Sequence, residues 1–139
     1  MIKKKFKKLN IYKNSNVGNT FISQGVWGLK SLSTGILTKK QLESARKVLV
    51  GKTKRGCKIW IKVNFNTPIT QKGKGSRMGK GSGVIVDHVC NVTQGRVIFE
   101  VFFNSLFSNK FIKQLLISVS KKFSFRTRLC KKQNIDIFL

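Results

Sequence analysis

The segment 68–83 most limits how this chain can fold, because it cannot belong to a hydrophobic core. Five glycines alternate there with lysine and arginine, and the segment contains no acidic residue. Glycine lets a backbone approach a ligand closely, and the cations attract phosphate. The segment must therefore be solvated or packed against something negative. We interpret it as a long basic loop that reaches into nucleic acid, with the cations Lys72, Lys74, Arg77 and Lys80.

The charge balance indicates the class of partner. Lysine and arginine total 29 of the 139 residues, and four acids oppose them, which gives a net charge of +25. That charge is far above the value of about 2–8 that suits a small soluble domain. Hydrophobic residues make up 40% of the chain, which is enough for a folded core. Because such a protein would repel its own copies and attract polyanions, we expect nucleic acid as partner and no homo-oligomer.

The sequence lacks catalytic and metal-binding patterns. Its four acids provide no carboxylate pair for acid–base or two-metal catalysis. Residues 75–82 superficially look like a P-loop, but Gly81 follows Lys80 where that motif needs serine or threonine. The three cysteines lie far apart in the sequence, and the chain contains a single histidine. We therefore expect buried thiols and no metal site. We therefore expect neither enzymatic activity nor a cofactor.

Local patterns predict two helices and several strands. Thr38 and Gln41 form a capping box that opens a helix, and Gly51 is a plausible end for it. A second helix is predicted within 106–119, where phenylalanine and aliphatic residues form a stripe. Strands are predicted at 21–32, 57–65, 84–92, 96–103 and 123–130.

Residues 57–65 alternate in polarity, which predicts a strand with one core face. The expected core residues are Ile59, Ile61, Val63 and Phe65. On the other face, Lys58 and Lys62 flank Trp60. That face can hold phosphate and stack on a base, or Trp60 can cover a second apolar layer. The sequence leaves both interpretations open.

The last predicted strand, 123–130, also carries cations on one face. Arg126 and Arg128 project opposite the apolar residues of that strand. No acid lies near them in sequence to form an ion pair. RNA contact is therefore the favoured interpretation for both arginines.

The mixture of helices and strands, without a regular βαβ repeat, predicts a compact single domain of the α+β class with mostly antiparallel strands. We expect this domain to span 23–130 and to carry the long basic loop at 68–83. Residues 1–22 are expected to form a basic N-terminal arm, either solvated or in contact with RNA. Residues 131–139 are expected to form a C-terminal tail.

Several segments occur in the same order as in one known family. They are Gly28–Lys30, Leu37–Arg46, Gly56–Val63, Pro68–Thr70 and Arg77–Gly83. Through them, residues 23–130 resemble the bacterial-type ribosomal protein sixteen of the large subunit. The resemblance implies an α+β fold bound to large-subunit ribosomal RNA near the central protuberance, beside neighbouring ribosomal proteins. It also implies a role in subunit assembly and no catalysis.

The resemblance further implies that the basic loop reaches toward the peptidyl-transferase centre and helps to position the A-site tRNA. The loop-tip residues carried over from the family are Arg77, Met78, Gly79, Lys80 and Gly81. A family basic patch corresponds to Lys54, Arg55 and Lys58. The further candidates for ribosomal RNA contact are Arg46, Lys62, Arg126 and Arg128.

The richness of the chain in lysine, asparagine, isoleucine and phenylalanine indicates an AT-rich gene. Together with the divergence from the family pattern, it favours an organellar ribosome, in the mitochondrial matrix more than in a plastid.

The sequence leaves two alternative functions to consider. A cationic membrane-surface protein would need an amphipathic helix with many cations, whereas 106–119 contains only Lys110 and Lys113. A free basic RNA-binding protein or RNA chaperone would explain the charge but not the order of the family segments. We therefore expect no membrane partner and favour the ribosomal function.

Overall fold

The computed structural model describes residues 19–75, 77, 79 and 81–132. In this described part, two helices and seven strands form the α+β fold that the sequence predicts. In chain order they are β1 (Trp27–Ser31), β2 (Gly35–Thr38), α1 (Lys39–Lys52), β3 (Cys57–Ile61), β4 (Thr67–Gln71), β5 (Val84–Val92), β6 (Val97–Phe103), α2 (Asn109–Ser120) and β7 (Thr127–Lys131).

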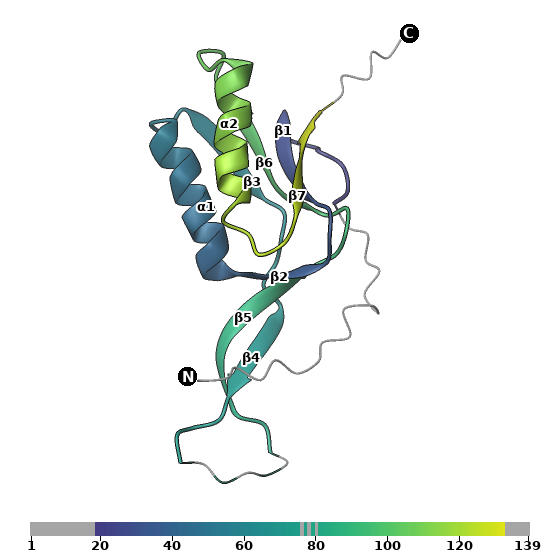
Figure 1. The fold of residues 1–139 in the computed structure, drawn as a ribbon, viewed down its shortest axis with the longest axis vertical. Helices are drawn as coiled ribbons and strands as arrows, with labels where there is room; N and C mark the ends of the chain where they lie inside the picture. Colours follow the sequence, from purple (N-terminus) through teal and green to yellow (C-terminus); the bar gives the residue numbers. More distant parts are fainter. Residues whose placement is uncertain (1–18, 76, 78, 80, 133–139) are drawn as a thin grey trace.

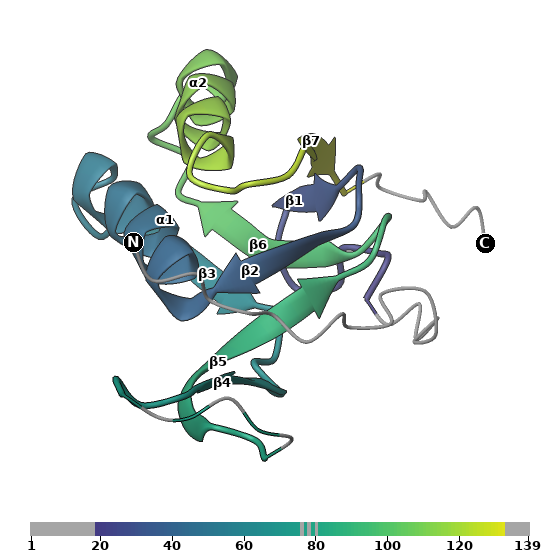
Figure 2. The same ribbon diagram turned by 60° about the horizontal axis from the view of Figure 1, so that its bottom comes forward.

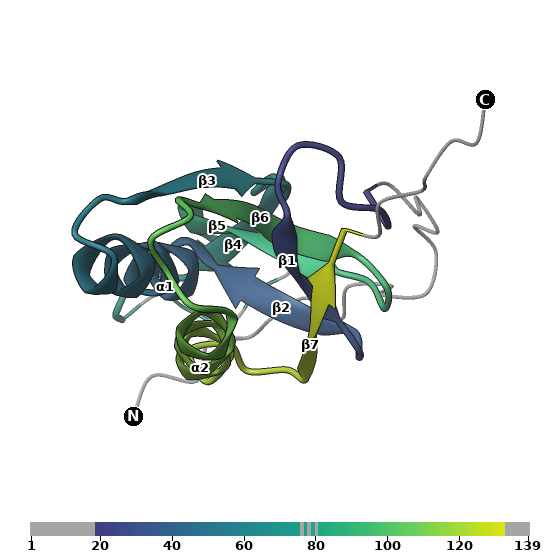
Figure 3. The same cartoon turned by 90° about the horizontal axis from the view of Figure 1, so that it is seen from above.

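The main sheet has the strand order β3-β6-β1-β7, and all its pairs are antiparallel. Both helices lie on one face of this sheet, and the chain leading into β1 crosses the other face (Figure 3). The core between sheet and helices includes the fully buried Leu29, Leu49, Val101 and Leu116. The predicted hydrophobic stripes of both helices therefore face this core.

A second sheet, with the order β2-β5-β4, carries the long hairpin. Strand β5 runs beside β2 close to the body and beside β4 farther out (Figure 2). The β4–β5 hairpin extends away from the helices and ends in residues 72–83 (Figure 1). We call this hairpin with its loop the finger. The predicted loop is thus shorter than expected, because its first four residues belong to β4.

A buried carboxylate fastens the chain before β1 to the main sheet. Glu100 in β6 is fully buried and accepts hydrogen bonds from the backbone amides of Ser23 (3.1 Å), Gln24 (2.7 Å) and Gly25 (2.8 Å). The ammonium of Lys62 lies 3.6 Å from the carboxylate. Burial alone would raise the pKa of Glu100, but these donors outweigh it and hold that pKa below 4.5.

Gly25 permits the close approach that this arrangement requires. A Cβ atom at Gly25 would lie 2.9 Å from the Cβ of Glu100 and 2.9 Å from the amide nitrogen of Val101. The segment from Asn19 to Gly25 consequently lies against the sheet, since Asn19 also accepts a hydrogen bond from Val97. The last residues of the expected N-terminal arm therefore belong to the domain, and residues 1–18 lie outside the described part.

The capping box is confirmed. The amide of Gln41 donates to the Thr38 hydroxyl (3.3 Å), and the amide of Thr38 donates to the Gln41 side chain (3.0 Å). The helix does not stop at Gly51 but continues to Lys52. Thr53 is the C-cap, and the helix cannot continue because Lys54 and Arg55 have positive φ angles.

Strands β5 and β6 match the predicted ranges closely, whereas the other strands differ. The strand predicted at 57–65 ends at Ile61, which is exposed rather than buried. Strand β3 is at the edge of its sheet, so its last residue has a strand neighbour on one side only. Val63 is buried as expected, although it lies beyond the strand.

The strand predicted at 21–32 is shortened to β1, because Glu100 holds the residues before it in an irregular turn. The last strand begins at Thr127, after a turn that buries Phe123, and includes Lys131 of the expected tail. Residues 133–139 lie outside the described part. The sequence analysis did not predict β2 or β4.

Two further features bear on the predicted class of protein. Among the described residues, neither helix is long and apolar enough to span a membrane. Cys90 is a buried free thiol, as expected, and burial raises its pKa despite the opposing charge of Arg96.

The base of the finger depends on a second close approach. A Cβ atom at Gly83 would overlap the carbonyl oxygen of Gln71 and lie 2.8 Å from the amide nitrogen of Lys72. Gly81, two residues earlier, has no atom within 4 Å of its Cβ position. Gly83, unlike Gly81, therefore permits the two sides of the hairpin to approach closely where the loop begins.

We predict that Glu100→Gln lowers the free energy of unfolding by about 2 kcal/mol or more at neutral pH, because three amides and Lys62 lose a charged partner. Since the folded-state pKa lies below 4.5, the carboxylate stabilises the fold above that pH and stops doing so as pH falls through the folded-state pKa. Urea unfolding at several pH values measures both effects.

The control for this experiment is Glu43→Gln, which removes an exposed acid of the same type. It should change stability little, because exposed ion pairs contribute little. Equal stability of Glu100→Gln and the unaltered protein, or equal losses in both variants, would show that the buried carboxylate is not an anchor.

We predict that Gly83→Ala opens the base of the finger, because the added methyl group collides with the backbone at Gln71 and Lys72. Hydrogen exchange of the amides in β4 and in the first half of β5 should become faster. The matched variant Gly81→Ala should leave these rates unchanged. Similar exchange in both variants would contradict the role of Gly83.

Candidate nucleic-acid interface

Cations gather around a hollow at the C-terminal end of α1. The hollow is lined by Arg46, Lys47, Val50, Gly51, Lys54 and Arg55. Three of the predicted RNA-contact residues thus come together in one place. Lys47 joins them, although the sequence analysis did not select it. We call these residues the α1 hollow.

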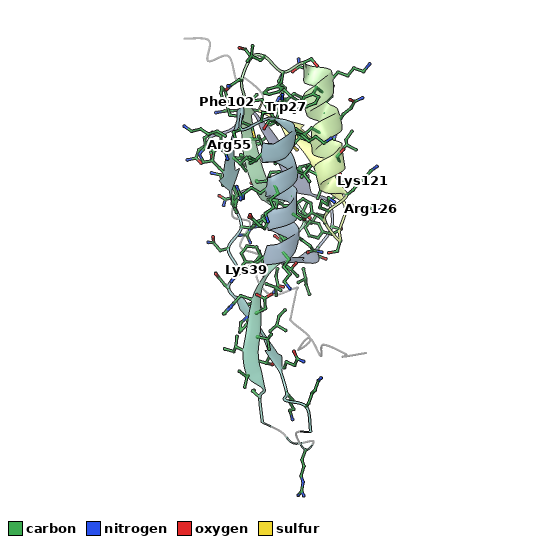
Figure 4. All side chains as sticks on the ribbon, turned by 90° about the vertical axis from the view of Figure 1, so that its left-hand side faces the viewer. Trp27, Lys39, Arg55, Phe102, Lys121 and Arg126 are labelled. Atoms are coloured by element: carbon green, nitrogen blue, oxygen red, sulfur yellow. The ribbon has the colours of Figure 1, made fainter. Side chains whose placement is uncertain are left out.

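An unusual backbone conformation presents two of these cations. Lys54 and Arg55 have φ angles of 47° and 64°, a left-handed conformation that is uncommon for residues other than glycine. The amide of Arg55 donates to the carbonyl of Val50 at 3.0 Å, which closes the turn after the helix. Arg55 extends outward on the same side of the body as Phe102 (Figure 4). Strained residues of this kind are common at functional sites.

Arg46 is already paired with an acid. Its guanidinium donates to both carboxylate oxygens of Glu43, at 2.7 Å and 3.0 Å. This hydrogen-bonded pair lowers the pKa of Glu43 and raises that of Arg46. A phosphate at the α1 hollow would therefore have to share Arg46 with Glu43. The sequence analysis missed this pair, although its i,i+3 spacing on a helix is a recognisable signal.

Lys62, predicted to contact RNA, already has partners within the protein. Its ammonium donates to the hydroxyl of Ser23 and to the side chain of Gln24, both at 3.0 Å, besides lying near Glu100. The side chain is only 17% exposed. Lys62 thus holds the segment before β1. Lys58, by contrast, is exposed on the edge strand β3.

The finger presents cations at its far end. Lys72 is exposed, but its ammonium donates across the loop to the carbonyl of Gly79 at 2.6 Å. Lys74 and Arg77 are exposed as well. Gly81 is also exposed, whereas Met78 and Lys80, two of the predicted tip residues, lie outside the described residues.

The stalk of the finger is apolar on its surface. Val84, Ile85 and Val86 are 77%, 56% and 59% exposed, so both faces of this part of β5 meet solvent. Exposed apolar patches in soluble proteins often mark interaction sites. The sequence analysis placed these residues in a strand but gave no sign that they would be uncovered.

The C-terminal arginines are separated from the α1 hollow. Arg126 lies at the opposite edge of the body from Arg55, near Lys121 (Figure 4). Arg128 lies on β7 and is exposed, directly across from Lys30 of β1. The predicted RNA-contact residues therefore form a basic surface that extends around the body rather than one pocket. Within the described residues, no group of histidine, cysteine or acidic side chains is arranged to hold a metal ion.

Comparison with known proteins shows what this chain is similar to. The family model described as ribosomal protein L16p/L10e matches residues 1–130. The chain is 35% identical over 130 residues to the large ribosomal subunit protein uL16 of Psychrobacter arcticus, which covers 92% of this chain and 93% of that protein.

Two other bacterial relatives carry the same protein name. The protein of Staphylococcus carnosus is 34% identical over 118 residues, covering 85% of this chain and 80% of its own length. That of Aeromonas salmonicida is 41% identical over 99 residues, covering 70% and 72%. Members of this family are structural components of the ribosome and not enzymes. The chain therefore belongs to the ribosomal protein L16p/L10e family, as the order of its segments predicts.

Proposed function

We propose that this chain is a structural constituent of the large ribosomal subunit, where it binds ribosomal RNA near the central protuberance. The observation that carries the proposal is the finger. A hairpin extends from the body and places the cations Lys74 and Arg77 at its far end. Such a shape has few contacts of its own to stabilise it, and a negatively charged surrounding would supply them.

The body is suited to contact the backbone of folded RNA. The cations of the α1 hollow and those around Arg126 lie on different sides, so one RNA molecule would have to surround the domain or several helices would have to meet it. Neutralisation of phosphates by these cations releases counterions. Recognition would depend on RNA shape and phosphate positions more than on base edges.

The finger would extend toward the peptidyl-transferase centre and the A-site tRNA. This part of the proposal depends on the resemblance of the loop tip, where Arg77 and Gly79 match the family pattern. The exposed apolar stalk supports it, because Val84, Ile85 and Val86 would be covered if the finger lay inside the subunit. In that position the chain would support both subunit assembly and the placement of tRNA, beside neighbouring ribosomal proteins.

We further propose that the ribosome concerned is mitochondrial, with a plastid ribosome less favoured. The three relatives described above are bacterial, so this step depends on composition and on the divergence from the family pattern. The chain is rich in lysine and in phenylalanine, of which it has 11. Sedimentation of a tagged chain with the large subunit from a mitochondrial lysate, after a high-salt wash, tests both the compartment and the ribosomal role.

We predict that the double variant Lys54→Ala with Arg55→Ala binds large-subunit ribosomal RNA more weakly, because it loses both cations of the left-handed turn after α1. The slope of log affinity against log salt should fall by about 2, one unit for each lost phosphate contact. The matched control is Lys39→Ala with Lys40→Ala, which removes the same charge from the other end of α1. Equal slopes in the two double variants would show that only net charge matters.

We predict that Arg77→Ala impairs elongation more than subunit assembly, because the side chain lies in the loop and contributes nothing to the core. Sucrose-gradient occupancy measures assembly, and translation by the purified ribosomes measures elongation. Lys74→Ala, in the same loop, serves as control and should have the smaller effect. Normal elongation by fully occupied Arg77→Ala ribosomes would contradict the proposed contact near tRNA.

A further inference from the structure

Two aromatic side chains, Trp60 of the edge strand β3 and Phe102 of β6, lie on the face of the main sheet away from the helices. In its pairing with β6, Lys58 lies opposite Phe102 and Trp60 lies opposite Glu100. Directly opposed residues of antiparallel strands share a face. The segment before β1 contacts Glu100, so this is the face that the helices leave uncovered. Trp60 and Phe102 are therefore diagonal neighbours on it.

The protein covers this face only in part. The segment 23–25 lies over the carboxylate of Glu100, in the middle of the sheet. Toward the β3 edge, Phe102 remains 43% exposed and Trp60 is partly exposed. The turn 23–25 contacts Glu100 and Lys62 through hydrogen bonds.

The charges around the two rings are all positive toward solvent. Lys58 is exposed, and Arg55 extends on the same side as Phe102 (Figure 4). Glu100 is the acid on this face, and it is fully buried and paired. Lysine is depleted in protein–protein interfaces, whereas aromatic rings beside cations are the usual means of holding unpaired nucleotides.

We propose that Trp60 and Phe102 form a stacking platform for an unpaired nucleobase of RNA, with Lys58 in contact with an adjacent phosphate. The inference rests on the proposed RNA-binding function and adds the kind of RNA element bound at this face: a bulge, loop or single strand. The platform follows the α1 hollow in the chain, because strand β3 begins two residues after Arg55 of the hollow.

The test compares a short oligoadenosine with an abasic strand of the same length, using binding to the full-length protein measured by fluorescence anisotropy. The test variant is Trp60→Leu, which keeps an apolar side chain but cannot stack. Trp60→Phe should restore most of the affinity, and Phe102→Ala is a second, independent variant. Phe21→Leu is the matched control, since Phe21 is an exposed ring near Lys30 and away from β3.

We expect Trp60→Leu and Phe102→Ala to weaken binding of oligoadenosine about tenfold, the typical loss of one base–aromatic stack. Binding of the abasic strand should not change, and circular dichroism should show an intact fold. Unchanged oligoadenosine binding, equal losses for both strands, or an equal loss in Phe21→Leu would overturn the platform. Unchanged oligoadenosine binding would indicate that this face contacts a neighbouring protein instead of RNA.

Failure of the underlying function would give a different result. If the unaltered protein bound neither strand nor ribosomal RNA, the proposed RNA-binding function itself would be wrong. If it bound RNA normally but Trp60→Leu behaved like the unaltered protein, only the stacking platform would be wrong.

Discussion

A single buried carboxylate organises the main sheet. Glu100 lies in the middle of β6 and receives three backbone amides from the turn before β1. It thereby fixes where β1 enters the sheet, and β1 in turn pairs with both β6 and β7. In a chain with 29 cations and four acids, one acid is thus enclosed away from solvent, and the protein itself supplies its hydrogen-bond donors. Lys62 lies against it and completes the anchor.

The anchor separates two regions with different physical character. The body has a continuous core of aliphatic and phenylalanine side chains between sheet and helices. The finger has no such core, and its shape depends on the β4–β5 pairing and on the close approach at Gly83. A rigid body can hold its cations in fixed positions for RNA, whereas the outer part of the finger obtains little stability from the protein itself.

Local signals in the sequence predicted the elements that have strong local causes. The capping box at Thr38, the strand predicted at 84–92 and the stripe of α2 each depend on residues close in sequence. Strand β4 escaped prediction because it is short and contains Pro68 at a sheet edge, where proline is tolerated. Ile61 was assigned to the core because alternation indicates the two faces of a strand but does not show how much of each face is buried.

The candidate site was predictable in composition but not in arrangement. Lys62 was expected to face RNA, and only the fold brings it to Ser23, 39 positions away. Lys54 and Arg55 were selected by resemblance, but their left-handed backbone follows from the turn after α1. Trp60 is partly exposed opposite Glu100, and the turn that Glu100 fixes on this face lies more than 70 positions away from Glu100 in sequence.

The exposed stalk has a consequence for the chain before it finds its partner. Three neighbouring apolar side chains, Val84, Ile85 and Val86, lie open to solvent beside the edge strand β4. Uncovered edges of this kind promote aggregation. The charge of +25 opposes it, because copies of the chain repel one another. Electrostatic repulsion therefore opposes aggregation, and the proposed RNA partner would cancel it only while also covering the exposed apolar stalk.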